Sequence, residues 1–256
     1  MEYYLILSGL LFCYMSLWFG VSLIQKRNDV ADVAWGIGFV FMAWASYSLS
    51  EAHGGRGILV ASLVSIWGLR LAWHIQARHR GRPEDYRYAK WRIEWGKWFY
   101  LRSFAQVYIL QGALLFLIVM PVLFVNRAMG QAIGVVDVLG VIVWVIGFFF
   151  ESVGDAQLAR FIKDPTNKGH LMQSGLWRYT RHPNYFGEVV MWWGIWIVAL
   201  SAPSGFWSIV GPIAITFLIL KVSGVPLLEK KMMENPEFAE YQRRTSMFVP
   251  WFRTKD

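Results

Sequence analysis

Long apolar runs alternate with short charged segments along the chain. The runs carry few charged residues or none, and they extend over residues 3–25, 33–50, 57–69, 103–126, 128–150 and 189–220. A hydrocarbon core of about 30 Å is crossed by about 20 helical residues. Runs of this length predict an all-α integral membrane protein rather than a protein built on sheets.

The last run is too long for one ordinary crossing. At about 1.5 Å per residue, residues 189–220 would form a helix of about 48 Å. Near its middle, residues 202–205 read Ala-Pro-Ser-Gly, which is typical of a turn. Division of the run at this turn predicts seven transmembrane helices, near residues 3–24, 30–50, 57–76, 103–125, 134–155, 184–201 and 206–226.

The placement of the cations predicts the orientation of these spans. All but three of the 25 Lys and Arg residues fall in segments on one side of the predicted membrane. Arg56 and Arg127 lie on the other side, and Arg70 lies within a span. Because cytoplasmic loops carry the excess of Lys and Arg, we expect the N-terminus outside and the C-terminus in the cytoplasm. A six-span alternative, with 189–220 as one tilted helix, is disfavoured because it would move the C-terminal cations across the membrane.

Composition narrows the class of protein further. Hydrophobic residues make up 56% of the chain and charged residues 16%, against about 25% charged in soluble domains. This composition excludes disordered, collagen-like and disulfide-scaffold proteins and disfavours a soluble enzyme. The net charge of +8 is explained by topology signals and attraction to anionic head groups. We therefore expect membrane lipids, and not nucleic acid, as partners; the sequence leaves the oligomeric state open.

Ionisable groups within the predicted spans are candidates for function, because they are costly at membrane depth. All of them are expected near the cytoplasmic boundary, where they would converge on one cavity; individually, each also fits a snorkelling side chain or a structural pair. The residues are Asp32, Arg70, His74, Glu151, Asp155 and Glu188. Glu151 and Asp155 share a helix face and need cations or donors opposite. The nearest suppliers in sequence are Arg160, Lys163, Arg178 and Arg181.

The segment 175–188 holds the densest group of polar residues. Pro183 suits the first turn of a helix, which places Asn184 and Glu188 on one face, one turn apart. The residues just upstream lie where a helix N-terminus adds positive potential. They are Arg178, Tyr179, Arg181 and His182. The pattern predicts an anion site at the membrane edge, for a phosphate-bearing cofactor or for a lipid head group.

The predicted loop 76–102 carries a second basic group. Its forked guanidinium groups, beside a turn, suit bidentate contacts with phosphate. The candidate residues are Arg78, Arg80, Arg82, Asp85, Arg87 and Tyr88. Downstream, Trp91, Trp95 and Trp98 recur at helical spacing, which is typical of an interfacial helix with an aromatic anchor.

Several familiar sites are missing from the sequence. There is no G-x-G-x-x-G and no G-x-x-x-x-G-K-[ST], so neither a Rossmann nor a P-loop nucleotide site is encoded. Gly36 and Gly38 lie within an apolar span, where glycine favours close helix packing. The five His residues do not have the spacing of a His-rich di-iron cluster, and we expect no metal.

Four segments carry a resemblance to known membrane enzymes. RYTRHPNYFGE at 178–188 resembles a signature shared by integral-membrane sterol reductases and isoprenylcysteine methyltransferases. DVADVAWG at 29–36, WGLRLAWH at 67–74 and GRPEDYRY at 81–88 resemble the bacterial branch of the steroid 5α-reductase superfamily, often catalogued as a domain of unknown function. The resemblance implies a single transmembrane reductase domain over 1–256, located in a bacterial inner membrane, with an active site that faces the cytoplasm.

The reaction implied by this resemblance is the NADPH-dependent reduction of a carbon–carbon double bond conjugated to a ketone. The substrate would be hydrophobic, such as a 3-oxo-Δ4 steroid. Hydride goes to the β-carbon while a protein acid hydrogen-bonds the carbonyl oxygen and stabilises the developing enolate. The resemblance also implies that helix ends and cytoplasmic loops hold the nucleotide.

Seven residues match cofactor-binding positions of the superfamily. They are Glu151 with Asp155 near the nicotinamide ribose, Asn184 with Glu188 against the cofactor, Arg80 with Arg82 in the phosphate-binding loop, and Tyr179 at the start of the signature. The remaining candidates for cofactor binding come from the polar groups described above. They are His74, Arg78, Asp85, Arg87, Tyr88, Arg160, Arg178, Arg181 and His182.

The sequence departs from the animal members at the catalytic acid. Those enzymes use a Gln-Glu pair in the second helix and a tyrosine in the third. Here residues 57–76 contain no tyrosine, and the second span offers Asp32 instead of the pair. We expect Asp32 to be the acidic member, with Trp67 or Arg70 as its partner, and we expect it to act either protonated or as the orienter of another donor.

Two other functions fit parts of the sequence. An S-adenosylmethionine-dependent isoprenylcysteine or phospholipid methyltransferase shares the RHPNY region, and a tail with Glu229 is compatible with either class. Two long basic segments favour a cofactor with several phosphates over one with none. The non-enzymatic alternative is a lipid-binding or scaffold membrane protein.

Overall fold

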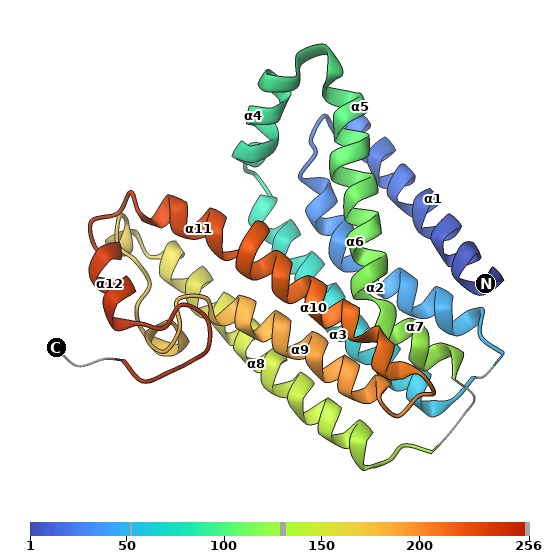
Figure 1. Ribbon diagram of the computed structural model, residues 1–256. Coiled ribbons are helices and arrows are strands. Elements are labelled where there is room, and N and C mark those ends of the chain that lie inside the picture. Colours follow the sequence, from blue (N-terminus) through green and yellow to red (C-terminus); the bar gives the residue numbers. More distant parts are fainter. Residues whose placement is uncertain (52, 129–131, 254–256) are drawn as a thin grey trace. The chain divides into compact units, whose positions relative to one another are not determined.

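The structure is a computed structural model that describes residues 1–51, 53–128 and 132–253. Within these ranges the chain is helical and contains no strand (Figure 1). The helices form two compact units, and each is described here by itself. Unit 1 comprises Met1–Gly134 and Ala199–Val210, and unit 2 comprises Val135–Val198 and Gly211–Asp256. The expectation of one domain stays a prediction.

Unit 1 is built on three long helices followed by a series of shorter helical segments. The long helices are α1 (Glu2–Gln25), α2 (Val30–Ser48) and α3 (Gly55–His79). The later segments are α4 (Tyr86–Trp95), η1 (Gly96–Trp98), α5 (Phe99–Ser103), the π-helical η2 (Phe104–Ile109), α6 (Leu110–Ile118), α7 (Met120–Arg127) and η5 (Gly205–Ile209).

Glycine allows α2 and α3 to approach closely. A Cβ on Gly36 would lie 2.6 Å from the carbonyl oxygen of Gly68, and a Cβ on Gly68 would lie 2.6 Å from that of Gly36. Any larger residue at either position would push the two backbones apart. The packing role predicted for Gly36 is confirmed, and this contact holds together the two helices that carry Asp32 and Arg70.

Unit 2 contains the helices of the C-terminal half. They are α8 (Val135–Lys163), η3 (Pro165–Asn167), η4 (Gly175–Arg178), most of α9 (Pro183–Ala199) and α10 (Val210–Phe217), the π-helical η6 (Leu218–Val222), α11 (Val225–Met232) and α12 (Phe238–Arg244). Within unit 2, α8 and α9 lie against each other through glycines spaced seven residues apart. These are Gly140, Gly147 and Gly154 on α8 and Gly187 and Gly194 on α9.

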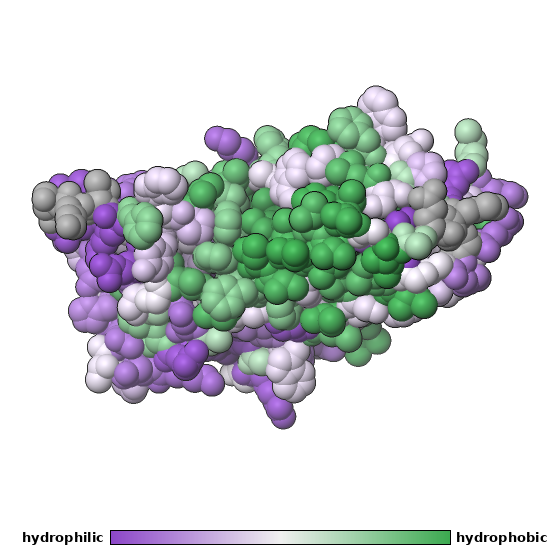
Figure 2. Space-filling model, turned by 90° about the horizontal axis from the view of Figure 1, so that it is seen from below, coloured by the Kyte–Doolittle hydropathy of each residue, from purple (hydrophilic) through white to green (hydrophobic). Residues whose placement is uncertain are grey.

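Six helical segments among the described residues are long and apolar enough to cross a membrane. Helix α9 matches the predicted sixth span but has only 17 residues. The chain turns between Ala199 and Gly205, so the predicted break in the last apolar run is confirmed. On the face drawn in Figure 2, hydrophobic residues gather in a broad field and hydrophilic residues lie toward its ends. The chain is therefore a multi-pass membrane protein, while the count of seven spans and their orientation stay predictions.

One predicted span ends later than expected. We placed the fifth span near 134–155, but α8 continues to Lys163. Arg160 and Lys163 lie in the last turn of α8, where cations interact favourably with the C-terminal end of the helix dipole. Residues 156–163, which follow the predicted span, therefore form the last turns of α8.

Candidate functional site

In unit 1, an acidic residue ties the start of α2 to the loop before α4. Asp29 accepts two hydrogen bonds from the Arg27 guanidinium, at 2.8 Å from Nε and 2.7 Å from Nη2. It also accepts one from the backbone N–H of Asp85 at 3.1 Å. Asp29 is buried, so its hydrogen bond to Asp85 holds the loop 81–85 against the N-terminal end of α2.

One turn further along α2, Asp32 pairs with two residues of α4. The Tyr88 hydroxyl donates to Asp32 Oδ1 at 2.9 Å, and Arg87 Nη2 donates to Oδ2 at 3.2 Å. Tyr88 is only 3% exposed. The structure thus joins three of the predicted site residues in one group, in which the phenol is buried and the carboxylate and the guanidinium are half-buried.

The expected partners of Asp32 lie on helix α3. Trp67 is buried, with its ring edge-on to Phe39 at 5.3 Å between centroids. Asp32 has two partners on α4, Arg87 and Tyr88, that we did not expect for it. The pairing of Asp32 with Trp67 or Arg70, and the catalytic roles of those two residues, stay predictions.

Sequence reasoning missed Glu84, which organises the same region. Its carboxylate accepts from the backbone N–H of Asn28 at 2.6 Å and from Arg92 Nη2 at 3.0 Å. The Asn28 side chain then donates to Ser103 Oγ at 2.7 Å. Hydrogen bonds between residues so distant in sequence leave no periodic signal. The basic residues of loop 76–102 and the GRPEDYRY resemblance pointed to this segment, but neither singled out Glu84.

Asp85 caps the N-terminus of α4, and its pKa can be tested through the pH dependence of stability. It accepts from the N–H and the Nε of Arg87, both at 2.9 Å. Burial opposes ionisation, but the hydrogen bonds and charge of Arg87 outweigh it and hold the pKa of Asp85 below its ordinary value. A carboxylate with a lowered pKa stabilises the fold above its unfolded pKa of about 3.9 and loses this effect as the pH falls further.

We expect Asp85→Asn to lower the free energy of unfolding by about 1 kcal/mol at pH 7, since asparagine still caps a helix but lacks the charge that holds Arg87. Thermal unfolding of both proteins in detergent measures the difference. It should stay constant from about pH 7 to pH 5 and shrink below about pH 4, as the parent carboxylate becomes protonated. A difference that grows as the pH falls contradicts this assignment.

Three arginines near the end of α3 remain available to an anionic ligand. Arg78, Arg80 and Arg82 are exposed, and their guanidinium groups form no ion pair with any described residue. Arg87, by contrast, is already paired with Asp32 and Asp85. Of the predicted phosphate-binding residues in this loop, these three are the ones with unneutralised charge. His74 lies on the same helix, α3.

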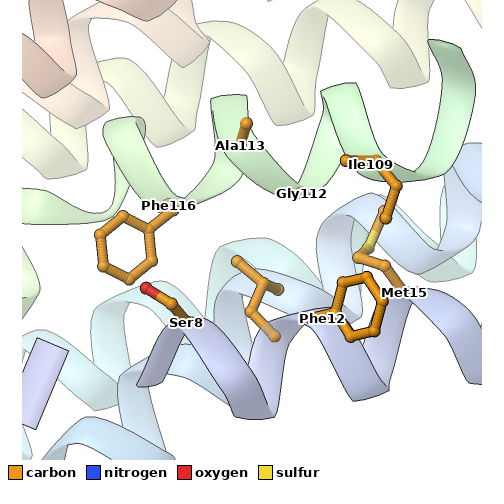
Figure 3. A pocket seen from close by; sticks show the side chains of 8 residues that line it. Ser8, Phe12, Met15, Ile109, Gly112, Ala113 and Phe116 are labelled. Carbon is orange, nitrogen blue, oxygen red and sulfur yellow. The ribbon is translucent and has the colours of Figure 1, made fainter. Parts of the chain in front are cut away.

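An apolar groove lies between α1 and the helical segments η2 and α6 of unit 1 (Figure 3). Its volume is about 330 Å³, near the lower end of the range of about 300–1,000 Å³ for ligand pockets. Ser8 has the one hydroxyl group among the residues that line the groove, and this hydroxyl donates a hydrogen bond to the carbonyl of Tyr4. The groove is lined by Ser8, Leu11, Phe12, Met15, Ile109, Gly112, Ala113 and Phe116. It therefore suits a hydrocarbon ligand.

In unit 2, the signature residues Arg181 and His182 bind a buried carboxylate. Arg181 Nε donates to Glu229 Oε1 at 2.8 Å, and His182 Nε2 lies 3.2 Å from the same oxygen. Arg181 Nη1 also donates to the carbonyl of Thr245 at 2.6 Å. All of these side chains are buried. Arg181 was one of four candidate cations for Glu151 and Asp155, and it has Glu229 of α11 as a carboxylate partner. Which cations face the acidic pair of α8 stays a prediction.

The acidic pair of α8 faces the first turns of α9. Asn184 Nδ2 donates to Asp155 Oδ1 at 3.1 Å. Glu151 is buried, and a Cβ on Gly187 would lie 2.4 Å from its backbone nitrogen. Two polar atoms in this region, Asn184 Oδ1 and His182 Nδ1, are buried and have no hydrogen-bond partner among the described residues. Such atoms are the expected anchors of a polar ligand.

The other candidates of unit 2 lie at its surface or nearby. Arg160, Arg178 and Tyr179 are exposed, and Glu188 is half-buried on α9. No group of three or more His, Cys, Asp or Glu residues that could hold a metal ion occurs in the described part of the chain. Asp32, Arg70 and His74 belong to unit 1, whereas Glu151, Asp155 and Glu188 belong to unit 2. Their convergence on one cavity stays a prediction.

Comparison with known proteins places the chain in a family. The uncharacterized protein C594.04c of Schizosaccharomyces pombe (strain 972) is 25% identical over 264 residues, which cover 91% of this chain and 75% of the relative. No solved structure matches the chain. The model of the family described as "Protein of unknown function (DUF1295)" matches residues 18–245. The chain, over most of its length, therefore belongs to the DUF1295 family.

Proposed function

We propose that this protein is an NADPH-dependent membrane reductase of the steroid 5α-reductase type. It reduces a carbon–carbon double bond conjugated to a ketone in a hydrophobic substrate, such as a 3-oxo-Δ4 steroid. The observation that carries the proposal is the pair of Tyr88 and Asp32, in which a buried phenol donates to a half-buried carboxylate at 2.9 Å. An oriented phenol is a suitable donor to a carbonyl oxygen that gains negative charge.

Each unit, taken by itself, holds exposed arginines that would bind phosphate groups of a dinucleotide. Arg78, Arg80 and Arg82 would bind phosphate in unit 1, since no described carboxylate neutralises them. In unit 2, exposed Arg160 and Arg178 have the same property, and Asn184 offers a buried oxygen without a partner. Arg87, Arg181 and His182 are already paired with carboxylates of the protein. They would therefore position neighbouring segments of the cofactor site and would not bind phosphate themselves.

The residues of the chain would act on the carbonyl end of the substrate. NADPH, when bound, supplies the hydride that is added to the β-carbon. On substrate binding, the Tyr88 hydroxyl, which donates to Asp32 in the free protein, would turn to give its one hydrogen bond to the carbonyl oxygen. The enolate that forms would take a proton from water at its α-carbon to give the saturated ketone. Asp32 positions the phenol beforehand, and Arg87 pairs with Asp32 through the contact at 3.2 Å.

The apolar groove supports a hydrophobic substrate. It is lined by α1, η2 and α6, which belong to segments apolar enough to span the membrane. Tyr108 lies next to the groove residue Ile109 and approaches the carbonyl of Asn28 at 3.5 Å. The groove is thus lined in part by η2, and η2 also contacts Asn28, just before α2, within unit 1. A substrate dissolved in the bilayer would reach this groove without crossing water.

The test uses the purified full-length chain in nanodiscs with NADPH and progesterone. We expect loss of the reduced nicotinamide absorbance and a product that keeps its ketone and gains two hydrogens. Intact, folded protein that consumes no NADPH across a panel of enones overturns the proposal. Calorimetry with NADPH and with S-adenosylmethionine, in parallel, distinguishes the reductase from the methyltransferase, and a lipid-binding scaffold would bind neither.

A further inference from the structure

The end of the chain lies along the segment that precedes α9. Arg181 N–H donates to the carbonyl of Ser246 at 2.9 Å, and Trp251 N–H donates to the carbonyl of Tyr179, also at 2.9 Å. Between them, Thr180 Oγ1 donates to the carbonyl of Phe248 at 2.8 Å. These contacts hold residues 246–251 at a fixed place in unit 2, although this segment forms no helix.

The segment exposes large apolar side chains instead of burying them. Val249 is 58% exposed, Trp251 70% and Phe252 80%. Met247 is also exposed, and Tyr179 lies edge-on to Phe252 with 6.4 Å between ring centroids. We call these five residues the terminal aromatic strip. A contiguous exposed group of this kind marks an interaction surface.

Exposed arginines lie beside the strip. Residues 170–182 and 241–253, which form and flank it, contain no Asp or Glu, although Glu237 contacts His170 and accepts from the N–H of Leu171, and Glu229 pairs with Arg181. Arg178 and Arg243 are exposed, and Arg253 is half-buried, with its Nη2 on Gln173 Oε1 at 3.1 Å. Apolar and aromatic side chains beside unneutralised arginines complement a surface that has acidic head groups above a hydrocarbon layer.

The strip is held close to the start of an apolar helix. It is hydrogen-bonded to residues 179–181, and the apolar helix α9 begins at Pro183. In membrane proteins, aromatic residues are enriched where apolar helices meet the lipid head groups.

We infer that the terminal aromatic strip is a membrane-surface anchor that inserts Trp251 and Phe252 among the anionic lipid head groups of the adjoining leaflet. Its arginines bind the acidic head groups and its apolar side chains enter the boundary layer. Through the hydrogen bonds to 179–181, the anchor would hold the signature segment at a fixed depth. This role is independent of the proposed reaction.

A spin label reports the depth of the strip in the full-length protein. Cys13 is the only cysteine, so Cys13→Ser gives a background for Val249→Cys and, as a matched exposed control, Gln242→Cys. Both variants are labelled and reconstituted in nanodiscs that contain phosphatidylglycerol. Collisions of the label with oxygen, which partitions into lipid, are compared with collisions with a water-soluble nickel chelate. We expect the oxygen-to-nickel ratio at residue 249 to exceed that at residue 242 several-fold.

Three further measurements decide the inference. With phosphatidylcholine as the only lipid, the ratio at residue 249 should fall toward that at residue 242, and an unchanged ratio contradicts recognition of anionic lipids. Addition of Trp251→Ser and Phe252→Ser should abolish the difference between the two sites. Equal access of the chelate to both sites overturns the anchor. So does a label at 249 that neither reagent reaches and that shows spin–spin coupling between copies, because a second copy would then cover the strip.

Discussion

Replacement of Tyr88 by Phe is expected to slow the reduction of an enone by about 10²–10⁴-fold, the range for loss of a positioned acid. The change removes only the hydroxyl that Asp32 now orients at 2.9 Å. Because this hydroxyl is assigned to the carbonyl oxygen of the substrate, kcat should fall while the Kd of NADPH stays unchanged. Single-turnover rates and calorimetry on the same preparation measure the two quantities.

The same helix provides a matched control. Tyr86 is 59% exposed and lies two residues before Tyr88, so Tyr86→Phe makes an identical chemical change outside the pair. It should leave kcat within about twofold, since surface changes seldom exceed about 0.5 kcal/mol. Asp32→Asn should reproduce the loss seen in Tyr88→Phe, and the double variant should lose little more, because the two residues act as a unit. Full activity in Tyr88→Phe would remove Tyr88 from the mechanism.

Replacement of Glu229 by Gln is expected to lower the free energy of unfolding by about 3–5 kcal/mol, the typical cost of breaking a buried ion pair. Glu229 lies 2.8 Å from Arg181 and 3.2 Å from His182, and all three side chains are buried. Glutamine keeps the size of the side chain but leaves the Arg181 guanidinium without a counter-charge. Thermal and denaturant unfolding of the detergent-solubilised protein measure the loss.

An exposed pair in the same part of the chain serves as the comparison. Glu240 and Arg244 form an ion pair at 2.8 Å on α12, with the Glu240 side chain 53% exposed. Glu240→Gln should cost at most about 1 kcal/mol, because solvent screens such pairs. If Glu229→Gln is no more destabilising than Glu240→Gln, the buried cluster contributes little to stability. The presence of Arg181 and His182 in the signature segment would then need another explanation.

The arrangement of helices was largely predictable from the sequence. Runs of about 20 apolar residues leave a helix as the one local structure that satisfies the backbone in lipid. The turn after Ala199 and a packing role for Gly36 could be predicted from local chemistry, because proline and glycine act within a few residues of their own position. That Gly68 is the partner of Gly36 could not be predicted in this way. Local signals of this kind do not depend on how distant segments of the chain pack together.

The partners within the candidate site were not predictable in the same way. Asp32 and Tyr88 are 56 residues apart in sequence, and Arg181 and Glu229 are 48 apart. Helical periodicity says which residues share a face, but it does not say which distant segment packs against that face. The sequence therefore indicated Asp32, Tyr88 and Arg181 as candidates, while their pairing with one another or with Glu229 required the folded chain.

The contacts around the signature segment also bear on how the protein is made. Residues 177–181 are hydrogen-bonded to groups that lie between 229 and 251, such as the Tyr241 hydroxyl, which donates to the Trp177 carbonyl at 2.6 Å. Chains emerge from the ribosome starting at the N-terminus, and domains fold as they become available. The signature must therefore wait, with Arg181 unpaired, until residues 229–251 have been synthesised. A stalled or truncated nascent chain would insert its early helices and still lack this part of the structure.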